Sequence, residues 1–329
     1  MSGFASTKDL ADKTISFNEL APGLYGYTAE GDPNSGVVVG DDSVLVVDAQ
    51  ATPLMAADVI ARVRTVTDKP IRHVVLSHYH AVRVLGASAY TGAEIIASDV
   101  CRAMTAERGQ QDTDSEIGRF PRLFRGRDSI PGLTWPTLTF HKRMTLYLGQ
   151  REVQIIHIGR SHTAGDTVVW LPKERVLFSG DVVEFGATPY CGDAHFADWP
   201  GTLAATQALG AEALVPGRGR ALMNAGECAE AIEGTRAFTS DLFAIVQRAS
   251  AGGAGLKQVY DQAMAEMRPK YGHWVIFEHC MPFNVTRAHD EARGLDHPRI
   301  WTAERDIEMW GALEQGAPVP AADDALGLL

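Results

Sequence analysis

Short runs of Val, Leu and Ile, separated by turn residues, follow one another along the first two-thirds of the chain. Two of these runs, at 36–39 and 44–47, flank the turn sequence Gly-Asp-Asp-Ser, a pattern typical of a β-hairpin. Similar runs lie at 17–28, where Pro-Gly interrupts the run, and at 71–76, 94–97, 145–148, 153–156, 168–171 and 176–178. Residues 53–67 instead repeat apolar side chains with a helical period. This succession of short strands predicts an α/β domain built on β-sheets.

The last third of the chain has a different character, because helical patterns replace the short strands. Residues 225–249 and 256–267 are helical in pattern, a Gly-rich break at 251–255 separates them, and a partly aromatic stretch follows at 274–281. We therefore predict a domain at 15–220 and a helical C-terminal extension at 221–329 packed on it. The segment 108–140 is too long for a simple connection, and we expect it to form a lid-like insertion or a wall near the functional site.

The charge of the chain restricts its partners. Among 329 residues there are 30 Lys and Arg against 41 Asp and Glu, a formal net charge of −11. This acidity argues against nonspecific binding to DNA or RNA, which depends on basic side chains. Charges also interrupt the N-terminal segment where a secretory signal would be apolar, and no apolar run is long enough to cross a bilayer. We expect a cytoplasmic protein that binds neither nucleic acid nor membranes.

Histidines and an aspartate follow three of the predicted strands. His78 and His80 come soon after the run at 71–76, and in extended chain their side chains point to the same side, as two ligands of one metal ion must. His162 lies in a Gly-bounded loop, and Asp181 follows the run at 176–178. Because functional groups of α/β proteins gather at strand ends, we expect these side chains to meet. Each of them taken alone is also consistent with a hydrogen-bonded histidine or a turn aspartate.

Five short motifs occur along the chain in a fixed order. They are NSGVVVGDDSVLVVD at 34–48, SHYH at 77–80, GRSHTAGD at 159–166, FSGD at 178–181 and VPGRG at 215–219. Together they resemble the metallo-β-lactamase superfamily over residues 17–220. The resemblance implies an αββα sandwich in which loops hold metal ions at one edge. It also implies hydrolase activity, since most members are hydrolases, while some are iron oxygenases or redox enzymes.

The chain departs from the first metal motif of this family, H-x-H-x-D-H. After His78 and His80, Val82 stands in place of the aspartate and Arg83 in place of the last histidine. Arg218 stands in place of the final histidine of the family. The resemblance therefore implies that the second metal site has lost its aspartate and both of its own histidines and keeps only Asp181, which normally bridges the two sites.

The same resemblance implies that the first metal site is retained. It would consist of His78, His80 and His162, with Asp181 available as a fourth ligand. Three imidazoles and one carboxylate suit a single Zn²⁺ ion, and Fe²⁺ and Mn²⁺ are alternatives. Asp48, after the run at 44–47, matches a position that orients a metal-binding histidine, although a simple turn residue at a strand end is an equal interpretation.

The arginines at former ligand positions allow two interpretations. Arg83 and Arg218 bind an anionic group of the substrate, such as a carboxylate, sulfate or phosphate. Alternatively, they pair with Asp181 or Glu184 and fill the space of the lost metal. Basic and aromatic side chains also alternate within 108–140, which suits an anionic or aromatic small substrate; a solvated helix with inward aromatic rings explains the same pattern.

Without the aspartate at position 82, another group must handle the proton of the attacking water. Asp193 and His195, which follow Asp181 by one loop, are the catalytic candidates together with Asp181 itself. Glu278 and His279 lie in the aromatic C-terminal stretch and are further candidates, while a core helix with satisfied polar groups is the alternative interpretation.

These features predict a hydrolase that uses water activated by a single metal on a small anionic ester, lactone, amide or thioester. A mononuclear non-haem iron oxygenase or redox enzyme on the same fold is the second interpretation, and a noncatalytic ligand-binding protein is the third. No G-x-S-x-G elbow, P-loop or Rossmann motif occurs, which argues against a serine hydrolase, a kinase and a dehydrogenase. The long C-terminal helices favour a homodimer.

Overall fold

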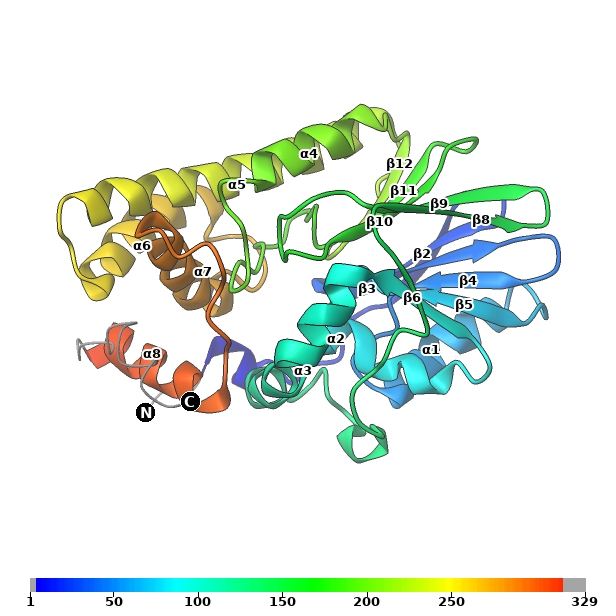
Figure 1. Cartoon of the computed structure of the whole chain (residues 1–329), viewed down its shortest axis with the longest axis horizontal. Coiled ribbons are helices and arrows are strands. Elements are labelled where there is room, and N and C mark those ends of the chain that lie inside the picture. The colour runs from blue at the N-terminus through cyan, green and yellow to red at the C-terminus, as the bar shows by residue number, and fades with distance from the viewer. Residues whose placement is uncertain (1–3, 316–329) are drawn as a thin grey trace.

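The computed structural model describes residues 4–315, and two β-sheets facing each other form its centre (Figure 1). The first sheet has the strand order β1-β2-β3-β4-β5-β6-β7. Its strands are β1 (Ser16–Ala21), β2 (Leu24–Ala29), β3 (Asp32–Val39), β4 (Val44–Val47), β5 (Ile71–Val75), β6 (Glu94–Ser98) and β7 (Leu138–Phe140). The second sheet has the order β12-β11-β10-β9-β8. Its strands are β8 (Arg143–Leu148), β9 (Arg151–His157), β10 (Thr167–Leu171), β11 (Val176–Gly180) and β12 (Ala213–Pro216).

Helices cover the outer faces of both sheets (Figure 1). The first sheet is covered by α1 (Pro53–Arg64), α2 (Ala81–Val84) and α3 (Asp99–Arg119), with the short 3-10 helices η2 (Leu85–Ala89) and η3 (Arg127–Ser129) nearby. The remaining helices are α4 (Trp199–Ala208), α5 (Ala225–Ala251), α6 (Leu256–Tyr271), α7 (Phe277–Ala292) and α8 (Ala303–Gln315). Of these, α5 contacts β12 of the second sheet and packs with α4, α6 and α7, while α8 packs against α3, α6 and α7. A 3-10 helix near the N-terminus, η1 (Ala5–Lys8), packs against α3 and α7. No helix within residues 4–315 is both long and apolar enough to cross a membrane.

Alternating side chains along the strands produce this layered arrangement. In β4, Val44 and Val46 pack with the helices outside the first sheet, whereas Leu45 and Val47 pack between the sheets. In β10, alternate residues likewise pack either between the sheets or against the C-terminal helices. Both faces of each central strand are therefore apolar. The predicted αββα sandwich with a helical C-terminal region is confirmed.

The predicted hairpin at 36–47 is present, with β3 and β4 antiparallel and Gly36 opposite Val47. The predicted helices at 53–67, 225–249 and 256–267 correspond to α1, α5 and α6. The aromatic stretch at 274–281 comprises the approach to α7 and the first turn of this helix, which is longer than expected, and α8 was not predicted. Residues 316–329, which the predicted C-terminal extension includes, lie outside the described residues.

The segment 108–140 consists of several elements. Its first part is the second half of α3, a helix whose N-terminus is capped by Ser98, because the Ser98 side chain accepts a hydrogen bond from the Cys101 backbone N–H at 3.0 Å. A turn and η3 follow, and β7 then joins the edge of the first sheet. The helix forms a wall beside the functional site described below, while motion of this segment as a lid stays a prediction.

The sheets approach each other closely at Gly36 in β3. A Cβ atom at this position would lie 2.2 Å from Cδ1 of Phe178, a buried residue of β11 on the facing sheet. Because the aromatic ring is enclosed between the sheets, it has little room to move away.

We therefore expect Gly36→Ala to lower the free energy of unfolding by about 1–3 kcal/mol, the usual cost of overpacking a core. Gly118→Ala is the matched control, since Gly118 is exposed on α3 and its Cβ would meet no atom within 4 Å. The control should be neutral or stabilising by up to about 1 kcal/mol, because alanine favours helix. Urea denaturation measures both values. A free energy of unfolding for Gly36→Ala equal to that of wild type would contradict the close approach of the sheets.

Candidate metal centre

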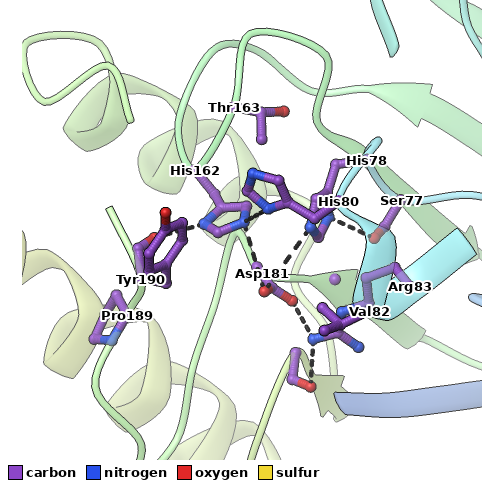
Figure 2. Close-up of polar contacts among 12 residues, drawn as sticks. Ser77, His78, His80, Val82, Arg83, His162, Thr163, Asp181, Pro189 and Tyr190 are labelled. Atoms are coloured by element: carbon purple, nitrogen blue, oxygen red, sulfur yellow. Dashed lines mark hydrogen bonds and ion pairs between the residues drawn. The ribbon is translucent and has the colours of Figure 1, made fainter. Parts of the chain in front are cut away.

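Loops at one edge of the sandwich bring His78, His80 and His162 together (Figure 2). His78 and His80 follow β5, and His162 lies in the loop between β9 and β10. Each of the three residues is 1% exposed, and one ring nitrogen of each lies within 4.8 Å of the others. Asp181, directly after β11, lies beside this group. The meeting of these side chains agrees with their expected position at strand ends.

One nitrogen of each ring is fixed by a neighbouring polar group. His162 Nδ1 donates to the backbone carbonyl of Tyr190 at 2.7 Å, and His78 Nδ1 lies 2.9 Å from Oγ of Ser77. His80 Nε2 lies 3.0 Å from a carboxylate oxygen of Asp193. These contacts determine which nitrogen of each imidazole turns inward.

The remaining nitrogens converge on a common space. His80 Nδ1 lies 2.9 Å from His162 Nε2, while His78 Nε2 is buried without a hydrogen-bond partner among the described residues. Asp181 Oδ2 lies 3.6 Å from His162 Nε2 and 4.0 Å from His78 Nε2. A buried polar atom without a partner is costly. The donor set of three imidazoles and one carboxylate therefore fits a divalent metal ion.

Burial lowers the pKa of His162 to about 3 and that of His78 well below its usual range, so both rings are neutral and offer lone pairs. His80 differs. Burial acts to lower its pKa as well, but the carboxylates of Asp112, Asp193 and Glu116 together raise it to about 9. In the absence of a metal, His80 is therefore the positively charged ring of the three, and His78 and His162 are neutral.

Asp193 fixes the orientation of the His80 ring through its contact with Nε2. It also accepts a hydrogen bond from the Tyr79 hydroxyl at 2.6 Å and one from Arg108 Nη1 at 3.0 Å. All four side chains are buried. Burial acts to raise the pKa of Asp193, but the hydrogen bond and charge of His80, with help from Arg108, hold it below its usual range. Asp193 is thus an ionised group that receives three donors.

The wall formed by α3 supplies residues that sequence reasoning missed. Asp112 accepts a hydrogen bond from the backbone N–H of Ala81 at 2.8 Å, and Glu116 accepts one from Val82 at 2.9 Å. With Arg108, these residues are spaced four apart and lie on one buried face of the helix. The signal available in the sequence was the spacing of four between Arg108, Asp112 and Glu116, which places three charged side chains on one face of the helix.

Asp181 forms ion pairs with both arginines at former ligand positions. Arg83 Nη2 donates to Oδ1 of Asp181 and, at 2.7 Å, to the carbonyl of Gly217. Arg218 Nη1 donates to Oδ2 of Asp181 at 2.8 Å and to Oε1 of Glu184 at 3.2 Å. Arg83 is 1% exposed and Arg218 4%. Burial acts to raise the pKa of Asp181, but the two guanidiniums hold it well below its usual range.

Two further features shape this charged cluster. A Cβ atom on Gly217 would lie 2.3 Å from Oδ1 of Asp181, so only glycine allows the loop after β12 to approach the carboxylate this closely. Val82, at the position of the family's aspartate, is buried and apolar. The space beside Asp181 therefore contains guanidinium groups and a valine. The pairing agrees with the second interpretation of the arginines, while binding of a substrate anion stays a prediction.

Asp48 reaches the histidines through another residue. Its carboxylate accepts hydrogen bonds from the backbone N–H and the hydroxyl of Ser77, both at 2.8 Å, and the Ser77 hydroxyl contacts His78. Arg83 Nη1 lies 3.6 Å from the same carboxylate. Asp48 thus acts on His78 indirectly, because Ser77 lies between them.

The other candidates for proton transfer lie outside the histidine group. Both ring nitrogens of His195 are buried without a hydrogen-bond partner among residues 4–315, and its Nδ1 lies 3.7 Å from Oδ1 of Asp296. Glu278 is exposed and pairs with Arg268. His279 is buried, with Nδ1 2.7 Å from the Ser6 hydroxyl. Catalytic roles for these residues stay predictions.

Comparison with known proteins decides the family. The sequence profile described as "Metallo-beta-lactamase superfamily" matches residues 28–218, more than half of the chain. The chain belongs to the metallo-β-lactamase superfamily. The match contains the histidine triad, Asp181 and both arginines, and it ends before the C-terminal helices begin.

Individual relatives cover different parts of the chain. A linear primary-alkylsulfatase of Pseudomonas sp. is 22% identical over 235 residues, which are 61% of this chain and 44% of the relative. The sec-alkylsulfatase Pisa1 from Pseudomonas sp. has a similar structure, with a TM-score of 0.67, 15% identity, and coverage of 86% of this chain and 50% of that chain. A metallo-β-lactamase from Pontibacter korlensis aligns with a TM-score of 0.55 and 17% identity over 69% of this chain and 99% of that chain. The chain thus spans about half or less of either alkylsulfatase.

We expect Asp193→Asn to weaken zinc binding by about 10–100-fold, as is usual when the group that orients a metal-binding histidine is replaced. The amide keeps the shape of the carboxylate but loses the charge that His80, Tyr79 and Arg108 share. Competition with a chromophoric chelator measures the dissociation constant. Asp198→Asn is the control, because Asp198 pairs with the partly exposed Arg160. Equal zinc affinity in Asp193→Asn and wild type would contradict the anchoring of His80.

Proposed function

We propose that the chain is a hydrolase that works with one divalent metal ion, most suitably Zn²⁺, on a small anionic ester, lactone, amide or thioester. The observation that carries this proposal is the convergence of three buried imidazole nitrogens beside an aspartate that two arginines hold. The names of the relatives support hydrolysis, since they are those of a β-lactamase and of alkylsulfatases. The identity of the metal, the number of metal ions per chain and the substrate class are all part of what we propose.

His78 Nε2, His80 Nδ1 and His162 Nε2 would hold the ion, with Asp181 Oδ2 beside them. When bound, a divalent ion supplies a Lewis acid that activates water and polarises the bond to be cleaved. Ser77, Asp193 and the Tyr190 carbonyl keep the three rings in place.

The buried arginines support a single ion. A second divalent cation beside Asp181 would meet the guanidiniums of Arg83 and Arg218 at close range, and like charges repel strongly in a buried site. Both arginines are held by carboxylates or carbonyls, so they do not readily move away. The positive charge of these arginines also favours an anionic substrate.

The roles of the other polar residues follow from their partners. Ionised Asp181 can orient a water molecule by accepting its hydrogen bond, but its low pKa makes it a weak base. Asp193 is already occupied by three donors, which supports a positioning role. Burial, helped by Arg160 and Arg287, lowers the pKa of His195 to about 4, so this ring is neutral at pH 7 but, like Asp181, is a weak base. A role of His195 as the general base therefore depends on its reaching the attacking water, and it stays part of the proposal.

The experiment that tests this function compares wild type with His162→Ala on a panel of anionic esters, lactones, amides and thioesters. We expect wild type loaded with zinc to hydrolyse at least one class, and we expect a chelator to abolish this activity. His162→Ala should lose activity even with zinc added, because a ligand is missing. Circular dichroism checks that the variant is folded. His141→Ala is the control, since His141 is largely exposed, with a side chain 79% accessible.

Undiminished hydrolysis by folded His162→Ala would contradict the proposal. Oxygen consumption with stoichiometric iron, and no hydrolysis, would favour an iron oxygenase instead. A metal-free protein that binds ligands without turnover would favour a noncatalytic binding protein.

A further inference from the structure

A cavity of about 280 Å³ lies between η1, the loop that follows α3 and the approach to α7. The lining residues from η1 and from 272–279 lie outside the part of the chain that the family profile matches. Those from the turn into β3, from the loop after α3 and Arg218 lie inside it. Its apolar lining consists of Phe120, Leu123, Trp274, Ile276 and Phe277. The cavity is thus built from elements distant in sequence, and it offers an apolar surface to a small ligand.

Arg218 connects this cavity with the metal centre. It lines the cavity and is 4% exposed, while its Nη1 binds Asp181, whose carboxylate lies beside the histidine nitrogens. No described residue accepts a hydrogen bond from Nη2 or Nε of Arg218. Both atoms retain some solvent exposure. This edge of the guanidinium is therefore available to a ligand in the cavity.

The other charged residues of the lining already have partners. Arg122 forms ion pairs with Asp32 and with Asp9, and Glu278 pairs with Arg268. His279 also lines the cavity, but burial and the nearby charges of Arg119 and Arg218 hold its pKa well below the usual range, so the ring is neutral. Arg218 is also paired, through Nη1, with Asp181 and Glu184, so it offers the cavity the N–H groups of Nη2 and Nε and not an unpaired charge.

We propose that the cavity binds the apolar part of the substrate, while Nη2 and Nε of Arg218 bind an anionic group of the same molecule. The ligand class is a small organic anion with a short apolar chain or ring. The inference rests on the proposed function only in taking this ligand to be the substrate. It deepens that function, because the metal centre alone does not discriminate between substrates with and without an apolar part.

Hexanoate is a suitable probe, since it combines a carboxylate with a short apolar chain and cannot be hydrolysed. Calorimetric titration compares hexanoate with 1-hexanol, which has the chain without the charge, on the full chain with zinc and after chelation. We expect saturable binding of hexanoate in both states and binding of 1-hexanol weaker by about tenfold or more, because a charge-assisted hydrogen bond is lost.

Arg218→Gln should weaken hexanoate binding by about tenfold or more, for the same reason. Arg220→Gln is the matched control, because Arg220 has a side chain 53% accessible and pairs with Glu227.

Arg218 also forms an ion pair with Asp181, so Arg218→Gln can fail to fold. Ala5→Phe then decides: Ala5 is exposed and lines the cavity, so a phenyl group there occupies part of the cavity while every residue of the charged cluster is retained. Ala103→Phe, at an exposed position of α3, is its control.

Loss of hexanoate binding in Arg218→Gln, or in Ala5→Phe where Arg218→Gln does not fold, supports the inference. Equal binding of hexanoate and 1-hexanol overturns it, as does unchanged affinity in the deciding variant. Hexanoate binding that vanishes on chelation also overturns it, because the carboxylate would then depend on the metal. Failure of the proposed hydrolase function leaves binding to chelated protein unaffected, so the two failures are distinguishable.

Discussion

The carboxylate of Asp181 lies between two buried guanidiniums on one side and the nitrogens of the histidine triad on the other. Each charge is taken out of water, so each depends on its partners. Removing one member of such a cluster leaves an unpaired buried charge, which typically costs about 3–5 kcal/mol. The same pairing holds the loop after β12 against the loop after β11, since Arg83 also binds the carbonyl of Gly217. The charge balance at this point therefore connects the stability of the fold with the number of metal ions that the edge of the sandwich can accept.

The histidines are positioned by a second group of interactions, on the side of α3. Asp193 receives His80, Tyr79 and Arg108, while Asp112 and Glu116 accept backbone hydrogen bonds from the turn that follows His80. The carboxylates around His80 raise its pKa, whereas burial keeps His78 and His162 neutral. A metal ion bound to the three rings therefore replaces a proton that this environment favours.

The strands and their order along the chain were predictable because apolar alternation and turn residues are local signals. The histidine triad was predictable because its members follow strands and match the ordered motifs of a known family. The pairing of Arg83 with Asp181, 98 positions away, was one of two interpretations that the family motifs left open. The structure was needed to show that this contact forms. Anchoring of His80 by Asp193 joins residues 113 apart, and sequence reasoning assigned Asp193 to proton transfer instead. The helix α8 was missed because its apolar face is recognisable only when α3 and α7 are packed against it.

The claim that arginines replace the second metal is tested most directly by the zinc content of the purified protein. Wild type is equilibrated with excess zinc, freed of unbound ions by dialysis, and analysed by mass spectrometry beside His162→Ala. We predict about one equivalent of zinc per chain in wild type, and a loss of this zinc in the variant, because three imidazoles form one site. Two equivalents in wild type would contradict the replacement of the second metal by Arg83 and Arg218.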